Sequence, residues 1–286
     1  YRFDEEGGEK AIDSSGLGND ATIYKATGNR VPGRFGNALQ LQGSNEQYAE
    51  LPDGIMSNIN DFTISAWINA SSISTWARVF DFGNDTDTNM FLTVRSNNNT
   101  PRFAIKVNGS SEQIVNSSKA LSAGTWYHIA VTRTGNTVIM YINGEEVGRN
   151  NNVTFRPSDM GVTINNYIGN SQWPDPYFDG RIDEFSIFDY ALSAEEIKTL
   201  TITDISAVEV TTYIGEAPVL PDSVAVNYQD GTSGTATVIW NEIDPSLYAS
   251  EGTFTVAGVV NGTAVTATAY VKVNKSSEGK DRKSVV

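Results

Sequence analysis

Short runs in which apolar and polar residues alternate recur between Tyr1 and about Leu200. The runs are YAELP (48–52), FTISAWINA (62–70), ARVFDFG (77–83), MFLTVR (90–95), RFAIKV (102–107), WYHIAVTRT (126–134), TVIMYINGEEV (137–147), YIGN (167–170) and RIDEFSIFDY (181–190). A period of two residues is typical of strands with one face on a core. TGNT at 134–137 and NGE at 143–145 predict hairpin turns, because Gly and Asn tolerate positive φ. The pattern therefore predicts an all-β fold.

The run RIDEFSIF (181–188) is apolar on both faces. As a regular strand it places Ile182 and Phe188 on one side and Phe185 and Ile187 on the other. That pattern indicates a central strand in a sandwich of two sheets. Ser193 followed by Glu196 is a capping box, which predicts a short helix over 194–200 that closes the domain.

A second, smaller set of Thr- and Val-rich strands follows. Its turn spacing predicts a small immunoglobulin-like sandwich over 204–274, with Trp240 helping to fill a core that has no cysteine pair. The first domain is then 1–201. We interpret 275–286 as a polar linker followed by DRKSVV (281–286), six residues that a sequencing adapter would encode.

Composition narrows the possible partners. The 286 residues carry a formal net charge of −14 and no basic stripe, which argues against nucleic acid. No apolar run approaches the roughly 20 residues of a membrane-spanning helix, so we expect no membrane insertion. The absence of cysteine excludes disulfides and thiolate chemistry. The chain begins at Tyr1 without Met or signal peptide, and we expect a monomeric fragment with both ends cut.

Several of these segments carry a family likeness. In order they are AIDSSGLGNDATI, GRFGNALQLQGSNEQYAELP, FTISAWINA, GTWYHIAVTRTGNTVIMYINGEEVG, YIGNS and GRIDEFSIFDYALSAEEI. Together they resemble laminin-G-like, concanavalin A-like jelly-roll domains of bacterial modular proteins. YIGEAPVLP, YQDGT and GTFTVAGVVNG resemble the bacterial Ig-like modules beside glycoside hydrolase domains. The resemblance implies accessory modules of a secreted, family 43-like glycoside hydrolase.

Related folds include true glycosidases, which need two carboxyls about 5 to 9 Å apart around one glycosidic bond. Asp183 and Glu184 are adjacent, so on a strand they face opposite sides, and Arg181 separates Asp183 from Asp179. His128 has no second His, Cys or serine motif with which to build zinc or nucleophilic chemistry, and we expect it to be packed or on the sheet surface. We therefore expect the visible chain to be non-catalytic.

The resemblance also implies one structural Ca²⁺ where the terminal strands meet, with Asp183, Asp4, Gln42 and Asn45 as ligands. The alternative for Asp183 is a carboxylate that accepts backbone N–H groups of a loop. Residues 84–89 have two possible interpretations, a second Ca²⁺ site or a solvated hairpin tip. For Asp13 we expect an Asx-turn.

Sugar binding needs aromatic faces and planar polar groups in a shallow cleft or at loop tips. Trp173 lies in the Pro-interrupted loop NSQWPDPYFDG, whereas Trp67 and Trp126 lie in alternating strands and are expected in the core. By resemblance the concave sheet and its rim bind glycans. The candidates are Trp173, Tyr177, Asp175, Trp76, Arg78, Asn84 and Asp85. The alternative is that Trp173 plugs one end of the sandwich.

The resemblance favours a carbohydrate-binding module with an Ig-like spacer, which anchors a larger polysaccharide-degrading enzyme to plant-type or other glycans. A cell-surface adhesion module that binds protein, a structural spacer without a ligand, and a fragment of the glycosidase polypeptide itself are the alternatives. The expected location is extracellular or at a bacterial cell surface. The fold alone does not choose among these functions, because function belongs to the site.

Overall fold

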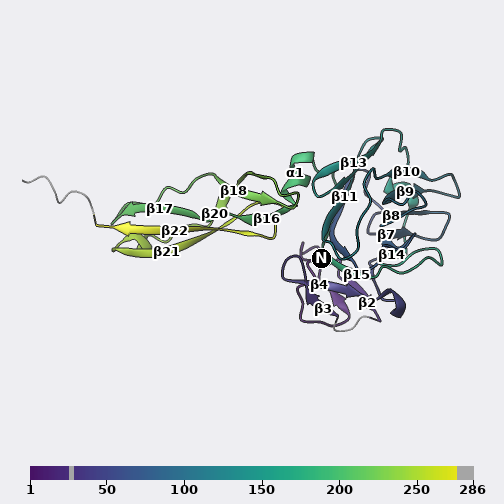
Figure 1. Cartoon of the computed structure of the whole chain (residues 1–286), viewed down its shortest axis with the longest axis horizontal. Helices are drawn as coiled ribbons and strands as arrows, with labels where there is room; N and C mark the ends of the chain where they lie inside the picture. Colours follow the sequence, from purple (N-terminus) through teal and green to yellow (C-terminus); the bar gives the residue numbers. More distant parts are fainter. Residues whose placement is uncertain (26–28, 276–286) are drawn as a thin grey trace, which may run out of the picture. The chain divides into compact units, whose positions relative to one another are not determined.

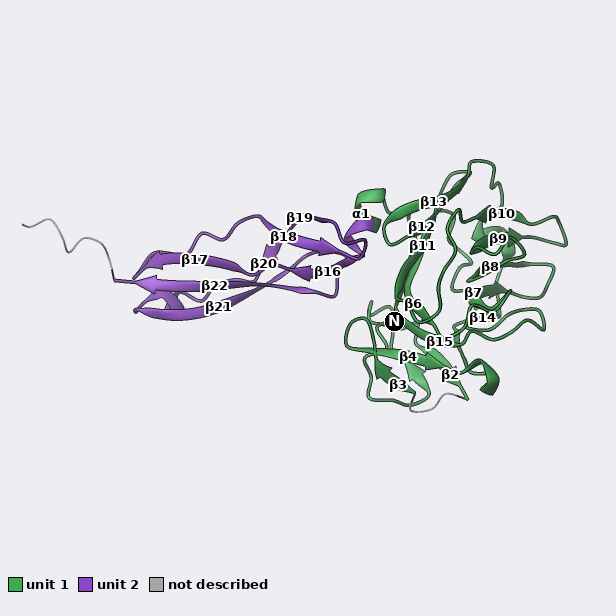
Figure 2. Cartoon of the chain, viewed as in Figure 1, with its two compact units in different colours: residues 1–197 green, residues 198–286 purple. Residues whose placement is uncertain are grey.

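The computed structural model describes residues 1–25 and 29–275. The chain divides into two compact units, 1–197 and 198–286, which Figure 2 colours separately. Both units are built from sheets, so the all-β prediction is confirmed. The predicted linker and adapter-derived segment lies outside the described residues apart from Lys275.

The first unit is a sandwich of two antiparallel sheets (Figure 1). The eight-stranded sheet has, in spatial order, β1 (Lys10–Ala11), β2 (Ala21–Tyr24), β5 (Tyr48–Leu51), β14 (Asn165–Ile168), β7 (Arg78–Gly83), β8 (Asn89–Thr93), β9 (Arg102–Lys106) and β10 (Gln113–Asn116). The seven-stranded sheet has β13 (Glu145–Asn150), β12 (Thr137–Ile142), β11 (Tyr127–Thr134), β6 (Phe62–Ala70), β15 (Gly180–Phe188), β4 (Asn37–Leu41) and β3 (Arg30–Pro32). Two single-turn helices, η1 (Gly43–Asn45) and η2 (Pro157–Met160), lie in the connections.

The core lies between these sheets. Phe80, Phe82 and Phe103 enter it from the eight-stranded sheet, and Ile64 and Val131 enter it from the seven-stranded sheet. Each such side chain contributes about 1.5–3 kcal/mol when fully buried. The predicted turns are confirmed: Gly135 has φ 57° between β11 and β12, and Asn143 and Gly144 have φ 51° and 80° between β12 and β13.

Strand β15 is not regular. Its pairing with β6 shifts register between Asp183 and Ser186, and Glu184 within this bulge has φ 48°. The bulge adds one residue, so Ile182 and Phe185 both reach the core and Ile187 packs against it. The prediction that Ile182 and Phe185 point to opposite sides is therefore wrong, because it assumed unbroken alternation.

The predicted capping box is present at the start of α1 (Ala194–Thr199). The Glu196 carboxylate accepts the Ser193 backbone N–H at 2.8 Å, and the Ser193 hydroxyl accepts the Glu196 N–H at 3.3 Å. The boundary between the two units falls inside this helix, after Ile197.

Two tryptophans differ from their predicted place in the core. Trp67 is buried, but it lies on the outer face of the seven-stranded sheet, where the Phe35 ring packs edge-on at 5.8 Å. Trp126 immediately precedes β11 and is only half-buried. Both predictions failed for the same reason. Alternation of apolar and polar residues separates the two faces of a strand, but it does not say which face packs against the other sheet.

The second unit has two small sheets, as expected for an Ig-like sandwich. One contains β16 (Ile202–Ile205), β18 (Ser223–Tyr228) and β19 (Ser233–Thr237); the other contains β17 (Val208–Tyr213), β22 (Thr266–Asn274), β21 (Gly252–Val259) and β20 (Ile239–Trp240), with η3 (Pro245–Tyr248) between β20 and β21. Trp240 packs against the buried clusters of this unit and donates its indole N–H to the Pro221 carbonyl at 2.7 Å.

Candidate functional site

The outer face of the eight-stranded sheet carries an unusual row of side chains. Cross-strand register places Glu50 on β5 opposite Tyr167 on β14, Tyr167 opposite Asp81 on β7, and Asp81 opposite Phe91 on β8. Their chain neighbours Phe80, Phe82 and Leu92 point into the core. Because side chains alternate along a strand, the row projects away from the core, although other residues cover Asp81 and Phe91.

Arg78 is the centre of an aromatic cluster at one end of this row. Its side chain is only 3% exposed. The guanidinium carbon lies 4.0 Å from the Phe91 ring centroid and 5.5 Å from the centroids of both Trp76 and Trp173. Three rings around one cation are a cation–π arrangement, which is strongest where water is excluded. We call Trp76, Arg78, Phe91 and Trp173 the arginine–tryptophan cluster.

Two carboxylates hold Arg78 in this position. Its Nη2 pairs with Asp175 at 2.9 Å and its Nε with Asp81 at 3.4 Å, while Nη1 donates to the Trp76 carbonyl at 2.7 Å. Burial raises the pKa of Asp81 to about 7 and lowers the pKa of Arg78, and the ion pair only partly opposes either shift. The pair therefore holds the cluster together in a place from which water is largely excluded.

Hydrogen bonds to Asp81 hold the loop that carries Trp173 on the sheet. The Asp81 carboxylate accepts the Gln172 backbone N–H at 3.1 Å and the Ser171 hydroxyl at 3.4 Å. The Ser171 hydroxyl oxygen in turn accepts the Trp173 N–H at 3.1 Å. Trp173 is half-buried and packs edge-on against Phe91 at 5.9 Å between centroids. The indole is thus positioned by the sheet without being sealed inside the sandwich, although sequence reasoning left that alternative open.

Trp76 forms the opposite side of the cluster. It is half-buried, has φ 69°, and lies 5.3 Å from the guanidinium carbon of Arg102 on β9. Positive φ is rare for a bulky residue and marks a backbone held by its surroundings. Here the Trp76 N–H donates to the Arg95 carbonyl at 2.8 Å.

Four tyrosines form a second cluster on the same face. Tyr48 stacks on Tyr24 with centroids 4.8 Å apart and planes 13° apart, and it contacts Tyr167 at 5.4 Å and Tyr177 at 6.2 Å. Tyr24 is 39% exposed, and the other three are half-buried. Burial raises the pKa of Tyr48 to about 12, so its hydroxyl stays protonated and able to donate near neutral pH. We call these residues the tyrosine platform.

The structure brings together four of the seven predicted sugar-binding residues, namely Trp76, Arg78, Trp173 and Asp175. Tyr177 lies in the tyrosine platform, whose other three members sequence reasoning missed. Asn84 and Asp85 instead shape the β7–β8 hairpin. Asn84 accepts the Ile164 N–H at 3.0 Å, and Asp85 accepts the N–H groups of Asp87 and Thr88.

The two carboxylates among the predicted calcium ligands accept backbone N–H groups. Asp183 is fully buried, and its carboxylate accepts the backbone N–H groups of Arg34 at 2.8 Å, Phe35 at 3.0 Å and Glu184 at 2.8 Å. Asp4 accepts the N–H of Asn37, at the other end of the same loop. Both carboxylates already serve backbone donors, which is the alternative foreseen for Asp183.

Gln42 and Asn45 bond to each other at η1, with the Asn45 amide donating to Gln42 at 2.6 Å. Among residues 1–25 and 29–275, no group of three or more His, Cys, Asp or Glu side chains could hold a metal ion. Ca²⁺ also binds amide and backbone carbonyl oxygens, and it requires six to eight oxygens that converge. Calcium binding remains a prediction.

Two further expectations, for Asp13 and His128, can be compared with the structure. Asp13 accepts the Ser15 and Asn19 N–H groups at 2.9 Å each, which confirms the Asx-turn. His128 is buried beside Trp67, with ring centroids 5.5 Å apart, and burial lowers its pKa to about 3. Glu184 is half-buried, and its pKa is raised first by burial, with Arg2 opposing that shift. None of these groups lies on the outer face of the eight-stranded sheet.

The cluster also lacks the paired carboxyls of a glycosidase. Asp81 is fully buried beneath the Trp173 loop, and Asp175 is ion-paired with Arg78. A hydrolytic pair needs one carboxyl on each side of the bond being cleaved. The arrangement is therefore suited to gripping a ligand through aromatic faces and fixed polar groups.

A two-sheet sandwich with aromatic clusters on one outer face, followed by an Ig-like unit, defines the class of protein. The profile of the concanavalin A-like lectin/glucanases superfamily matches residues 43–198, and that of the bacterial Ig-like domain (group 4) matches residues 205–263. The chain belongs to the concanavalin A-like lectin/glucanases superfamily and carries a bacterial Ig-like domain after it.

Among solved structures, the chain is similar to domain 4 of AbnA, a GH43 extracellular arabinanase from Geobacillus stearothermophilus, in complex with arabinotriose. The identity is 23% and the TM-score 0.59, covering 69% of this chain and 94% of that one. An S-layer domain-containing protein from Clostridium thermocellum is 38% identical over 69% of this chain and 96% of that chain, with a TM-score of 0.37.

Among curated proteins, the chain is similar to the mouse "Sushi, von Willebrand factor type A, EGF and pentraxin domain-containing protein 1". The two are 26% identical over 168 residues, which are 52% of this chain. The match spans only 4% of that relative's length. Among the described residues, no helix is both long and apolar enough to cross a membrane.

Proposed function

We propose that the first unit is a non-catalytic carbohydrate-binding module that grips a glycan on the outer face of its eight-stranded sheet. The observation that carries this proposal is the convergence of Trp76, Arg78, Trp173 and Asp175 into one cluster beside four tyrosines. A sugar ring has an apolar face that packs on aromatic rings and a rim of hydroxyls that needs planar hydrogen-bonding partners.

The two clusters divide these tasks. The tyrosine platform offers half-exposed ring faces with hydroxyl groups at their edges. The arginine–tryptophan cluster offers two further indoles, with the Asp175 carboxylate beside them. Tyr167 and Asp81 join the clusters, because they are register partners on adjacent strands. From β5 to β8 there are three strand spacings, about 14 Å in all, so the face suits an oligosaccharide better than a single sugar.

The parent protein in this proposal is a secreted polysaccharide-degrading enzyme, with the Ig-like domain as a spacer outside the cell or at a bacterial cell surface. Similarity to a module of an extracellular GH43 arabinanase that was crystallised with arabinotriose supports this context. Anchoring would raise the effective concentration of a linked catalytic domain at its substrate. Plant-type arabinans are accordingly the first ligands to test.

A glycan array followed by calorimetry with the selected oligosaccharide tests the proposal. We expect binding to the wild-type chain and a loss of at least tenfold in affinity for Trp173→Ala, because a stacked aromatic contributes on the order of 1.4 kcal/mol or more. Tyr270→Ala is the matched control, since Tyr270 is an exposed aromatic residue of the second unit.

Two results would count against the proposal. One is equal affinity of the wild type and the Trp173→Ala variant for the same glycan. The other is binding to a protein partner with no response to any glycan, which would select the adhesion alternative. Unchanged affinity in Tyr270→Ala, combined with the loss in Trp173→Ala, would locate the glycan on the outer face of the eight-stranded sheet.

A further inference from the structure

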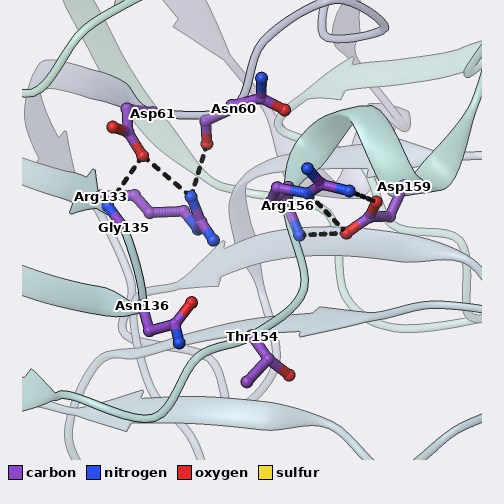
Figure 3. A pocket seen from close by; sticks show the side chains of 8 residues that line it. All are labelled: Asn60, Asp61, Arg133, Gly135, Asn136, Thr154, Arg156 and Asp159. Atoms are coloured by element: carbon purple, nitrogen blue, oxygen red, sulfur yellow. Dashed lines mark hydrogen bonds and ion pairs between the residues drawn. The ribbon is translucent and has the colours of Figure 1, made fainter.

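A shallow pocket of about 390 Å³ lies in the first unit, among residues that the proposed glycan-binding face does not use. Its lining comes from the segment before β6, the β11–β12 turn and the segment that leads into η2. The lining residues are Asn60, Asp61, Arg133, Gly135, Asn136, Thr154, Arg156 and Asp159 (Figure 3). All of them are polar or glycine, so the pocket offers no apolar surface against which a side chain of a partner protein could pack.

Arg133 is the least expected member of this lining. It is 2% exposed, although it carries a charge. Its Nη1 donates to the Asn60 carbonyl and to the Asp61 carboxylate, both at 2.9 Å. Its Nε is buried and has no hydrogen-bond partner in the part of the chain that the structure describes. A buried donor left without a partner is costly and calls for an explanation such as a bound ligand or an ion.

The unused donors of Arg133 define a particular shape. With Nη1 already engaged, the remaining edge of the guanidinium carries Nε and Nη2 in one plane. Two parallel N–H groups on such an edge match the two oxygens of a carboxylate. Figure 3 shows the guanidinium of Arg133 facing the space that separates Asp61 from Arg156.

Two arginines and two aspartates lie around the pocket, and Asp61 and Asp159 both oppose the effect of burial on the Arg133 pKa. Burial lowers the pKa of Arg133, Asp61 opposes that shift, and Arg156 adds to it. Asp61 is 42% exposed, so water weakens its hold on the buried cation. Arg156 forms a two-point pair with Asp159 at the surface, through Nη2 at 2.7 Å and Nε at 3.2 Å, and must leave that pair to meet another anion.

We propose that this pocket binds the carboxylate of an acidic sugar, such as a uronic acid residue of a polysaccharide. Arg133 would receive the carboxylate oxygens, Arg156 would close over them, and the Asn136 amide and Thr154 hydroxyl would meet sugar hydroxyls. The lining is already fixed for this role. Gly135 donates its N–H to Asp61 at 2.9 Å, and the Ser158 hydroxyl donates to the Asn60 side chain at 2.7 Å. A pre-organised site loses less entropy when its ligand binds.

Titration of the whole chain with D-glucuronate and D-galacturonate, followed by amide chemical shifts in NMR spectra, tests the proposal. We expect shifts at Gly135, Asn136 and Thr154 with either uronate and none with glucose, which lacks the carboxylate. Arg156→Gln should weaken uronate binding about tenfold, because a hydrogen bond to a charged group is lost. Asn136→Ala should weaken it a fewfold.

Arg149→Gln is the matched control, because Arg149 is an exposed arginine paired with Glu146 outside the pocket. Its uronate affinity should equal that of the wild type. Because Arg133→Gln could impair folding, Arg156→Gln and Asn136→Ala are the deciding variants.

Three results would overturn the proposal: no shifts with either uronate, equal shifts with glucose, or equal weakening in Arg149→Gln and Arg156→Gln. Shifts produced by acetate or by an acidic peptide with the same affinity as the uronates would also overturn it, since they would show that the sugar ring is not recognised. Trp173→Ala should leave uronate binding at this pocket unchanged, so the outcome is independent of the proposed glycan-binding face.

Discussion

Two buried aspartates of the first unit look alike by the usual indicators. Asp81 lies on the eight-stranded sheet and Asp183 on the seven-stranded sheet, and neither is exposed. Burial raises the pKa of both to about 7. A carboxyl perturbed in this way is often taken as a sign of a functional site.

The groups that each carboxylate contacts distinguish the two aspartates. Asp183 accepts three backbone N–H groups and ties the loop at 33–35 to β15, so it shapes the scaffold. Asp81 holds Arg78 and the loop of Trp173, and its Oδ1 has no partner among the described residues. The comparison teaches that a perturbed pKa reports burial, whereas the groups that the carboxyl positions report its role.

The largest expected effect is on Asp183. Asp183→Ala leaves three N–H groups without an acceptor beneath the loop, and we expect the free energy of unfolding of the first unit to fall by about 3–5 kcal/mol. Urea unfolding followed by tryptophan fluorescence measures it, since Trp67 packs under Phe35 of the same loop. Asp13→Ala, at an exposed Asx-turn, should cost about 1 kcal/mol. Equal losses in both variants would contradict the scaffold role of Asp183.

The second-largest expected effect is on how the stability of the first unit depends on pH. Asp81 and Asp183 have folded-state pKa values near 7, whereas an unfolded carboxyl titrates near 3.9. Between these values the folded state binds more protons than the unfolded state, so stability falls as pH rises. We expect the first unit to lose stability from about pH 5 to pH 7 and to change little above that. Urea midpoints across this range measure the loss.

Asn substitutions assign that loss to one carboxyl or the other. Asp81→Asn and Asp183→Asn each remove one titrating group, so each should flatten the curve in part. Only Asp81→Asn should also weaken glycan binding, because only Asp81 supports the loop of Trp173. A curve that stays flat in the wild type would show that both carboxyls remain ionised throughout.

A smaller effect is expected at the bulge that follows Asp183. Glu184 has φ 48°, a conformation that suits glycine better than a residue with a side chain. Glu184→Gly should therefore raise the free energy of unfolding by about 0.5–1 kcal/mol, unless contacts of the half-buried carboxylate outweigh the relief of strain. Thermal unfolding of the two proteins under identical conditions decides the sign, and a decrease would show that Glu184 stabilises through its side chain.

The smallest expected effect is that of metal removal. Because the oxygens of Asp183 and Asp4 already accept backbone N–H groups, we expect any fall in the melting temperature of the first unit after EDTA treatment to be small. A ligand bound only by the folded state would raise that temperature, so a clear fall after chelation would support the calcium prediction. Asp183→Ala cannot serve as the control here, since it removes the loop contacts as well.

Much of the fold could be predicted from the sequence, because alternation and turn chemistry are local signals. The strands around Trp67 and Val131, the hairpin at Asn143 and the capping box at Ser193 all follow from a few adjacent residues. The bulge at Glu184 could not be predicted, because an extra residue in a strand is specified by its pairing with β6.

The candidate site was only partly predictable for a related reason. Trp173 and Asp175 stand out in the sequence, because their loop is interrupted by Pro and lacks apolar periodicity. Tyr24, Tyr48 and Tyr167 do not stand out, since each occupies an ordinary outward position on its own strand. They meet only because β2, β5 and β14 are neighbours in the sheet, an order that no local pattern contains.

The attachment of the Trp173 loop has a consequence for how binding specificity could change. Asp81 grips this loop at its first residues, through the Ser171 hydroxyl and the Gln172 main chain. Apart from Asp175, which pairs with the buried Arg78, the residues from Trp173 to Tyr177 could then be substituted without disturbing the sheet beneath them. A few substitutions in this loop would then change which polysaccharide the module binds, while the sandwich that carries the loop stays the same.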